Sequence, residues 1–361
     1  MKLLRAVLVG VGPFEELVLS FADENGEARP VTVIHGGGGT GKSSVLAAIA
    51  STRPGHCVVQ QQRTDVHETV PEPRRPENAP SPFATCDWAL GKDEPARPHP
   101  LSVASPNARL SASDEIEALR RREQALFDRL ANDGGFAFLP IPSTRWFSRQ
   151  PIAFSAPART MARYDVRASA GLDDATRSDL ARETKQALAY AAIASALSPP
   201  SELGERRFDL LGAAMQSAVS TLVALRGFRY RGLDPLSFEP IFAAQGQGRA
   251  LPFDALPARA RHLVAFAALG VRTLWAAYPD QDPREAEGVI AIDEVDLHQD
   301  PQVQHKLLAA LSAALPEAQW ILTTTSAVVA GAADVRAVLA LRHLPEGAGV
   351  RVYAGEAART H

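Results

Sequence analysis

The chain has 361 residues, of which 46% are hydrophobic and 22% are charged, and its formal net charge is −3. These values are ordinary for a globular protein that buries a substantial core, and they give no general signal for nucleic acid or an acidic membrane surface. No apolar run approaches the roughly 18 residues of a membrane span, so we expect no membrane association. Cys57 and Cys86, the two cysteines, have no metal-ligand spacing. We therefore expect reduced structural thiols and a cytoplasmic location.

The N-terminal part predicts two paired strands, at 3–10 and 16–22, separated by a Gly-Pro turn. A third strand is expected at 31–35 and a helix over about 41–51. The prolines of 62–112 indicate a passage that is partly loop and mobile, interrupted by one strand signal at 83–90.

Between the third strand and the helix lies the pattern Gly-x4-Gly-Lys-Ser, which is a P-loop, or Walker A motif. Glycines bring backbone N–H groups close to phosphate oxygens, and the helix adds the positive end of its dipole. We expect Lys42 to reach the β and γ phosphates of ATP and the Ser43 hydroxyl to ligate Mg²⁺. The predicted nucleotide-binding residues are Gly36, Gly37, Gly38, Gly39, Thr40, Gly41, Lys42, Ser43 and Ser44.

Helices dominate the middle of the chain. The first is expected over 113–132, with Ile116, Leu119, Leu126 and Leu130 on its apolar face, and a buried strand follows at 136–141. The further predicted elements are helices at 173–197 and 204–226, strands at 228–231 and 236–244, and a helix at 257–278.

A second motif begins at Gly288, where an apolar strand runs into Asp293 and Glu294. This is a Walker B pattern. We expect Asp293 to hold Mg²⁺ opposite Ser43, and Glu294 to act as the base that polarises the attacking water.

The run from Ile292 to Pro301 resembles the Asp-Glu-x-x-x-His-x-x-Pro stretch of ABC-type ATPases of the SMC/RecF/OLD-like group. That resemblance implies a three-layer α/β head with N-terminal antiparallel strands and an inserted helical lobe. It implies heads that associate around ATP, and His298 as a structural residue rather than a metal ligand. Candidates for the family's Q-loop glutamine are Gln150 and the three glutamines at 60–62, although the favoured interpretation of each is an ordinary surface residue.

Two positions depart from the family pattern. Where the family has a Leu-Ser-x-Gly signature, this chain has Leu256 to Arg261, with Pro257 in place of the serine and Arg259 in place of the glycine. Arg259 or Arg261 could supply a positive charge to a partner's nucleotide, but the favoured interpretation is a solvated pair of arginines. Thr325 stands where the family usually has a histidine that contacts the γ-phosphate. Binding should therefore survive better than turnover.

We accordingly expect a single ABC-type head over 1–361, with the nucleotide-binding core at 1–60 and 228–361 and a proline-rich and helical insertion at 61–227. No long heptad run is present and about sixty residues follow the Walker B pair, so we expect neither a coiled-coil arm nor an appended nuclease. The sequence favours a slowly hydrolysing ATPase that switches by dimerisation.

The expected assembly is a homodimer or a hetero-assembly through the ATP face. A protein is the expected partner and nucleic acid an alternative one, in a setting such as DNA repair or phage defence. The competing hypothesis is a nucleotide-binding scaffold with little or no turnover that holds a nuclease or toxin.

Overall fold

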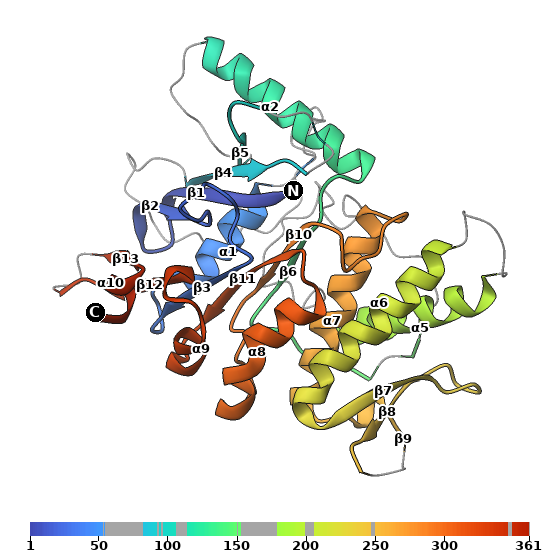
Figure 1. The fold of residues 1–361 in the computed structure, drawn as a ribbon. Coiled ribbons are helices and arrows are strands. Elements are labelled where there is room, and N and C mark those ends of the chain that lie inside the picture. The colour runs from blue at the N-terminus through green and yellow to red at the C-terminus, as the bar shows by residue number, and fades with distance from the viewer. Residues whose placement is uncertain are drawn as a thin grey trace, which may run out of the picture.

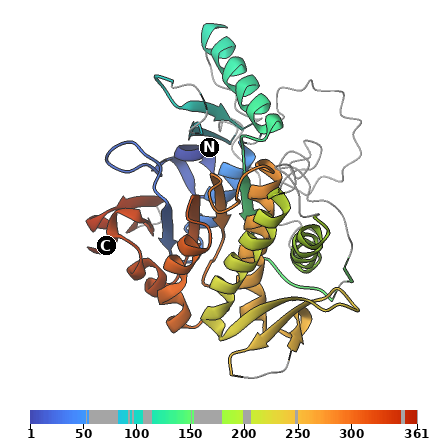
Figure 2. The same cartoon turned by 45° about the vertical axis from the view of Figure 1, so that its right-hand side comes forward.

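The structure is a computed structural model. It describes residues 1–52, 54, 82–91, 94, 97–105, 114–149, 151–152, 179–198, 206–246, 250–345 and 349–360. Three sheets and their helices make up these parts, and the N-terminal sheet and the α5–α7 helices lie at opposite ends of the molecule (Figures 1 and 2).

The central sheet has six strands in the order β13-β12-β3-β11-β10-β6. All neighbouring strands are parallel except β13, which pairs with β12 in the antiparallel sense. The strands are β3 (Val31–Gly36), β6 (Phe138–Ile141), β10 (Gly288–Ile292), β11 (Ala318–Thr324), β12 (Val338–His343) and β13 (Val350–Ala354). In this order β11 separates β3, which carries the glycine loop, from β10, which carries the acidic pair.

Both faces of this sheet are buried. Along β10, Val289 and Ala291 belong to one hydrophobic core, whereas Ile290 and Ile292 belong to another on the opposite face. This alternation follows from the two-residue period of a strand, and a strand covered on both sides is a continuous apolar run. The apolar sequences that predicted β3 and β10 are explained in this way.

One face of the central sheet is covered by helix α1 (Lys42–Ser51) and a four-stranded antiparallel sheet in the order β2-β1-β4-β5. Its strands are β1 (Lys2–Val11), β2 (Phe14–Ser20), β4 (Phe83–Ala89) and β5 (Leu101–Ala104). The buried Gln319 side chain on β11 accepts a hydrogen bond from the Leu3 amide (2.7 Å) and donates one to the Leu3 carbonyl (2.9 Å). One side-chain amide thus joins the two sheets without leaving a buried backbone group unpaired.

Helices cover the other face. Helix α7 (Ala258–Ala277) is almost entirely buried, and Gly270 allows it to approach Ile290 of β10 closely. Helices α5 (Ala181–Leu197) and α6 (Arg206–Val223) contact it, α8 (Pro301–Ala314) packs against α6, and α9 (Ala327–Ala332) packs against α8 and β3 (Figure 1). A three-stranded antiparallel sheet, β7 (Phe228–Leu233), β8 (Pro240–Ala244) and β9 (Ala250–Pro252), packs at the end of this layer (Figure 1). The short helix α10 (Glu356–Thr360) contacts β12 and β13.

The predicted three-layer α/β fold is confirmed, and most predicted elements agree with the structure to within a few residues. Two differences have a physical reason. Helix α2 (Asp114–Asp133) buries Leu130 but leaves Ile116 and Leu119 about half exposed, because only its C-terminal half packs on the protein. Helix α5 begins at Ala181 rather than 173. Asp179 pairs with Trp146 in an isolated β-bridge, and Leu180 then caps the helix.

Several expectations concern residues that lie outside the described ranges, among them Cys57 and most of 62–112. Cys86 is buried and free, and burial raises the pKa of its thiol to about 12, as expected of a structural thiol. The division at 60/61 and 227/228 stays a prediction; β4 and β6, from within the predicted insertion, pair with β1 and β10.

Among the described residues, one helical stretch, Arg207–Arg226, is long and apolar enough to cross a membrane, and 39% of its apolar window is buried. This stretch includes most of α6, which packs against α5, α7 and α8. A core helix has the same composition, so the finding is weak evidence for a membrane span.

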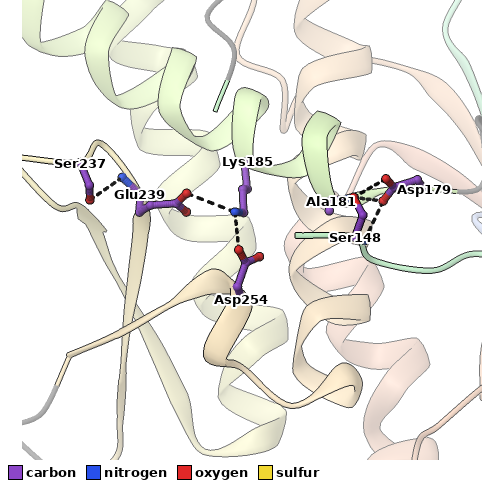
Figure 3. A network of polar contacts seen from close by, with 7 residues as sticks. All are labelled: Ser148, Asp179, Ala181, Lys185, Ser237, Glu239 and Asp254. Atoms are coloured by element: carbon purple, nitrogen blue, oxygen red, sulfur yellow. Dashed lines mark hydrogen bonds and ion pairs between the residues drawn. The ribbon is translucent and has the colours of Figure 1, made fainter. Parts of the chain in front are cut away.

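A buried lysine joins the helical layer to the small sheet (Figure 3). Lys185 of α5 is 1% exposed, and its Nζ lies 2.7 Å from Asp254 and 3.1 Å from Glu239. Asp254 lies in the 3₁₀ turn that leads into α7, and Glu239 directly precedes β8. The two carboxylates thereby fix the segment before α7 against α5.

We predict that Lys185→Met lowers the free energy of unfolding by about 2–4 kcal/mol, because it leaves two carboxylates without their buried cation. The exposed pair of Arg336 with Glu24 provides the control: Arg336→Met should change stability by less than about 1 kcal/mol. Urea unfolding of both variants measures the difference. Equal losses would show that the buried triad contributes no more than a surface pair.

Candidate functional site

Five parallel strands of the central sheet end at the same edge, and the predicted site residues follow three of them. Gly36 ends β3, Asp293 and Glu294 follow β10, Thr325 follows β11, and the segment to Arg145 follows β6. Ligands of open parallel sheets bind at this carboxyl edge. The sheet order therefore brings together two motifs that are far apart in the sequence.

The glycine loop is held by close contacts that exclude side chains. A Cβ atom at Gly36 would lie 2.7 Å from the Leu341 carbonyl oxygen, and one at Gly41 would lie 2.6 Å from the Phe14 ring. Gly41 also has a φ of 85°, a conformation that favours glycine. By contrast, a Cβ at Gly37 or Gly38 would meet nothing within 4 Å. The loop is thus packed at both ends and open at its tip, which suits a loop whose backbone receives phosphate oxygens.

Lys42 begins α1 and is buried. Its Nζ donates to the carbonyl oxygens of Gly36 (2.9 Å) and Gly37 (2.8 Å), and Thr40 Oγ1 donates to the Gly37 carbonyl as well (2.9 Å). These contacts hold the ammonium group against the loop, next to the N-terminus of a ten-residue helix. The ammonium group and the helix N-terminus both favour an anion at this loop.

Ser43 and Asp293, the two predicted Mg²⁺ ligands, lie in direct contact. The Ser43 hydroxyl donates to Asp293 Oδ2 at 2.7 Å, and the Thr323 hydroxyl donates to Asp293 Oδ1. A hydroxyl and a carboxylate oxygen form the donor set that Mg²⁺ prefers, with phosphates and water completing its octahedron. No group of three or more His, Cys, Asp or Glu side chains suited to a metal occurs in the described part of the chain. The pair thus fits a magnesium ion that arrives with a nucleotide.

Glu294 has a left-handed backbone, with a φ of 48°. Its N–H donates to Thr323 Oγ1 (2.8 Å) and its carbonyl accepts from Arg145 Nη2 (2.7 Å). A non-glycine residue in this region is uncommon and persists where its surroundings determine it. The backbone conformation is fixed by groups from β11 and from the segment after β6.

Arg145 is a site residue to which the sequence assigned no role. It is 4% exposed, and it donates to the carbonyl oxygens of Pro142 (2.9 Å), Asp293 (2.6 Å) and Glu294 (2.7 Å) and to His262 Nδ1 (2.9 Å). The sequence signal that could have identified it is its position, four residues beyond a buried strand. The Q-loop candidates Gln150 and 60–62 lie outside the described residues.

His262, in the second turn of α7, completes this buried cluster. Burial, together with the nearby Arg145, His298 and Arg261, lowers the pKa of its imidazole to about 2. The Phe147 ring stands perpendicular to it at 5.0 Å, and the His298 ring lies 5.1 Å away. His298 itself is exposed, with a φ of 64°. A neutral His262 can accept the hydrogen bond from Arg145, which a protonated ring could not.

The altered signature segment forms the start of α7. Pro257 caps this helix and its carbonyl accepts from the Ala260 amide (2.9 Å), so the helix start is kept as expected. Arg259 is 54% exposed and lies 3.9 Å from Asp300, while Arg261 stacks over the Phe147 ring at 5.2 Å. Thr325 is exposed. Arg259 is therefore both partly solvated and paired, and its guanidinium remains accessible.

We predict that the wild type loses more stability on acidification than His262→Asn, in which the amide oxygen replaces Nδ1 as the acceptor. The folded-state pKa of His262 lies below its unfolded value, so the unfolded state binds the extra proton as the pH falls below about 6.5. Between about pH 7.5 and pH 5, the free energy of unfolding of the wild type should fall by about 2 kcal/mol more than that of His262→Asn. Parallel stability curves from urea unfolding would contradict a buried neutral His262.

Comparison with known proteins shows which solved structures share this fold. No protein-family model and no curated protein matches the sequence. Among solved structures, an Smc head bound to the C-winged helix domain of ScpA is 14% identical, with a TM-score of 0.53 and coverage of 98% of both chains. The SMC head domain from Thermotoga maritima is 16% identical, with a TM-score of 0.50 and coverage of 99% of this chain and 100% of that one. The chain therefore has the fold of SMC head domains.

Proposed function

We propose that this protein binds ATP with Mg²⁺ at the loop Gly36–Ser44 and hydrolyses it slowly. The observation that carries the proposal is the 2.7 Å contact between Ser43 and Asp293, because it joins the two motifs at the sheet edge where Lys42 also lies. The SMC head fold supports the same function. Mg²⁺ bound there would neutralise phosphate charge.

Each group of the site has a separate role in this proposal. The amides of the loop and the N-terminus of α1 would hold phosphate oxygens, and Lys42 would exchange its contacts with Gly36 and Gly37 for the phosphates. Glu294 would accept a proton from, or orient, the attacking water. The Thr323 hydroxyl contacts the Asp293 carboxylate and the Glu294 amide, and so holds the Asp293 carboxylate close to the Glu294 backbone.

We further propose that ATP binding acts as a switch of association. In a head-to-tail dimer, Gly36–Ser44 of one copy would face Leu256–Arg261 of the other, with Arg259 supplying the charge that the altered signature lacks. ATP favours such a dimer only if it binds the associated state more tightly. A protein partner is part of the proposal, since one head of similar fold is solved with a domain of ScpA, and nucleic acid is the alternative. The proposed location is the cytoplasm, in keeping with the free thiol of Cys86.

One alternative has an observation in its favour. Thr325 is exposed where the resembling family has a histidine, and Arg259 is already near Asp300. A threonine cannot take up a proton near neutral pH. These features favour a nucleotide-binding scaffold with little turnover. Phosphate release by the wild type, compared with Glu294→Gln, separates the two: a scaffold shows the same low rate in both.

We expect Lys42→Ala to abolish measurable ATP binding while the fold remains, because the phosphates lose their buried cation. Lys306→Ala, on the exposed face of α8, is the matched control and should bind normally. Isothermal titration calorimetry measures both affinities. Unchanged affinity in Lys42→Ala would remove the nucleotide from this loop.

Glu294→Gln should trap the ATP-bound dimer, because nucleotide would bind and not be cleaved. Light scattering with Mg²⁺ and ATP should then show a doubled mass, and adding Arg259→Ala should weaken the dimer by about tenfold or more, as expected for a lost charge-assisted contact. A mass that never changes with nucleotide would favour the scaffold. A nucleotide-dependent dimer that Arg259→Ala does not weaken would support the switch and exclude Arg259 from it.

A further inference from the structure

The buried guanidinium of Arg145 links three segments through neutral acceptors. Its hydrogen bonds go to the Pro142 carbonyl just after β6, to the backbone carbonyls of Asp293 and Glu294, and to the imidazole of His262. The ring of Phe266 lies 5.2 Å below it. A cation removed from water is tolerated only while such partners compensate it.

The acceptors on one side belong to the proposed hydrolytic residues. Arg145 binds the carbonyl groups of Asp293 and Glu294, not their carboxylates, so both side chains stay available for Mg²⁺ and water. Since Glu294 has a left-handed backbone, its peptide has few alternative positions that keep both the bond to Thr323 and the bond to Arg145. A displacement of this loop must therefore move the guanidinium or break a bond to it.

The acceptor on the other side belongs to the helix of the proposed dimer face. His262 directly follows Arg261, and both side chains pack on Phe147, the imidazole at 5.0 Å and the guanidinium at 5.2 Å. A continuous set of contacts thus runs from the Glu294 backbone through Arg145 and His262 to Arg261. Packed contacts of this kind carry coupling when the elements that they join have two arrangements.

We propose that Arg145 is a positioning residue that couples the Asp293–Glu294 loop to the start of α7. Nucleotide at Gly36–Ser44 would thereby set the orientation of Pro257–Arg261 toward a second copy. The inference rests on the proposed function, and it adds a residue and a route by which the site regulates association.

The test uses Arg145→Gln, with Arg272→Gln as control. Arg272 is also a buried arginine, but it lies on α7 and pairs with Glu183 at 3.0 Å, away from the site. In the Glu294→Gln background, Arg145→Gln should keep ATP affinity within about threefold and weaken ATP-dependent association at least tenfold. Arg272→Gln should change neither.

Variants of His262 test the same link where Arg145→Gln fails to fold. His262→Phe keeps a ring against Phe147 but removes the acceptor, and should weaken association about as much. His262→Asn restores an acceptor and should largely rescue it. Where Arg145→Gln does fold, combining it with His262→Phe should add less than a twofold further loss, because both substitutions remove the same coupling. Losses that multiply, or no rescue by His262→Asn, would overturn the coupling.

Amide hydrogen exchange of Leu256–Phe266 distinguishes this inference from the proposed function. In the wild type, ATP should slow exchange in this segment, and in folded Arg145→Gln it should not. A wild type that binds no ATP would refute both proposals. ATP binding without a change in this segment, or with the same change in Arg145→Gln, would refute the role of Arg145 alone.

Discussion

The structure depends on a central sheet that is buried on both faces. Helix α1 and the N-terminal sheet cover one face, and α7 and α8 cover the other. The strands can therefore expose functional groups to a ligand only at their ends. The parallel direction of β3, β10 and β11 places those ends at one edge. The hydroxyl of Ser43 and the carboxylate of Asp293 meet there, although 250 residues separate them in the chain.

Thr323 and Arg145 give this edge its precision. The Thr323 hydroxyl, on the strand between the two motifs, contacts the Asp293 carboxylate and the Glu294 amide, while Arg145 holds the carbonyls of the same two residues. The Asp293 side chain and the backbone of both acidic residues are thus held by two neighbours. Such support holds reactive groups in place before a ligand binds, and it also connects them to α7 through His262.

The parts of this arrangement that local sequence encodes were predictable. The glycine loop and the apolar run before Asp293 indicate both their secondary structure and their chemistry. The paired strands at the N-terminus follow from the alternation of apolar and polar residues on either side of a turn. Arg145 was not predictable in its role, since its partners come from β10 and α7 and only the sheet order brings them near. Ile116 and Leu119 mislead for a related reason: a helical apolar stripe does not show how much of the helix has something to pack against.

The central claim is that the glycine loop and Asp293 together hold ATP with Mg²⁺. Calorimetric titration of ATP, with Mg²⁺ and with a chelator, tests it in the wild type, in Ser43→Ala, and in Ser51→Ala as a control at the far end of α1. The account predicts that Mg²⁺ tightens binding in the wild type and Ser51→Ala, and that Ser43→Ala loses most of this gain. No ATP binding by the wild type, or the same gain from Mg²⁺ in Ser43→Ala, would contradict it.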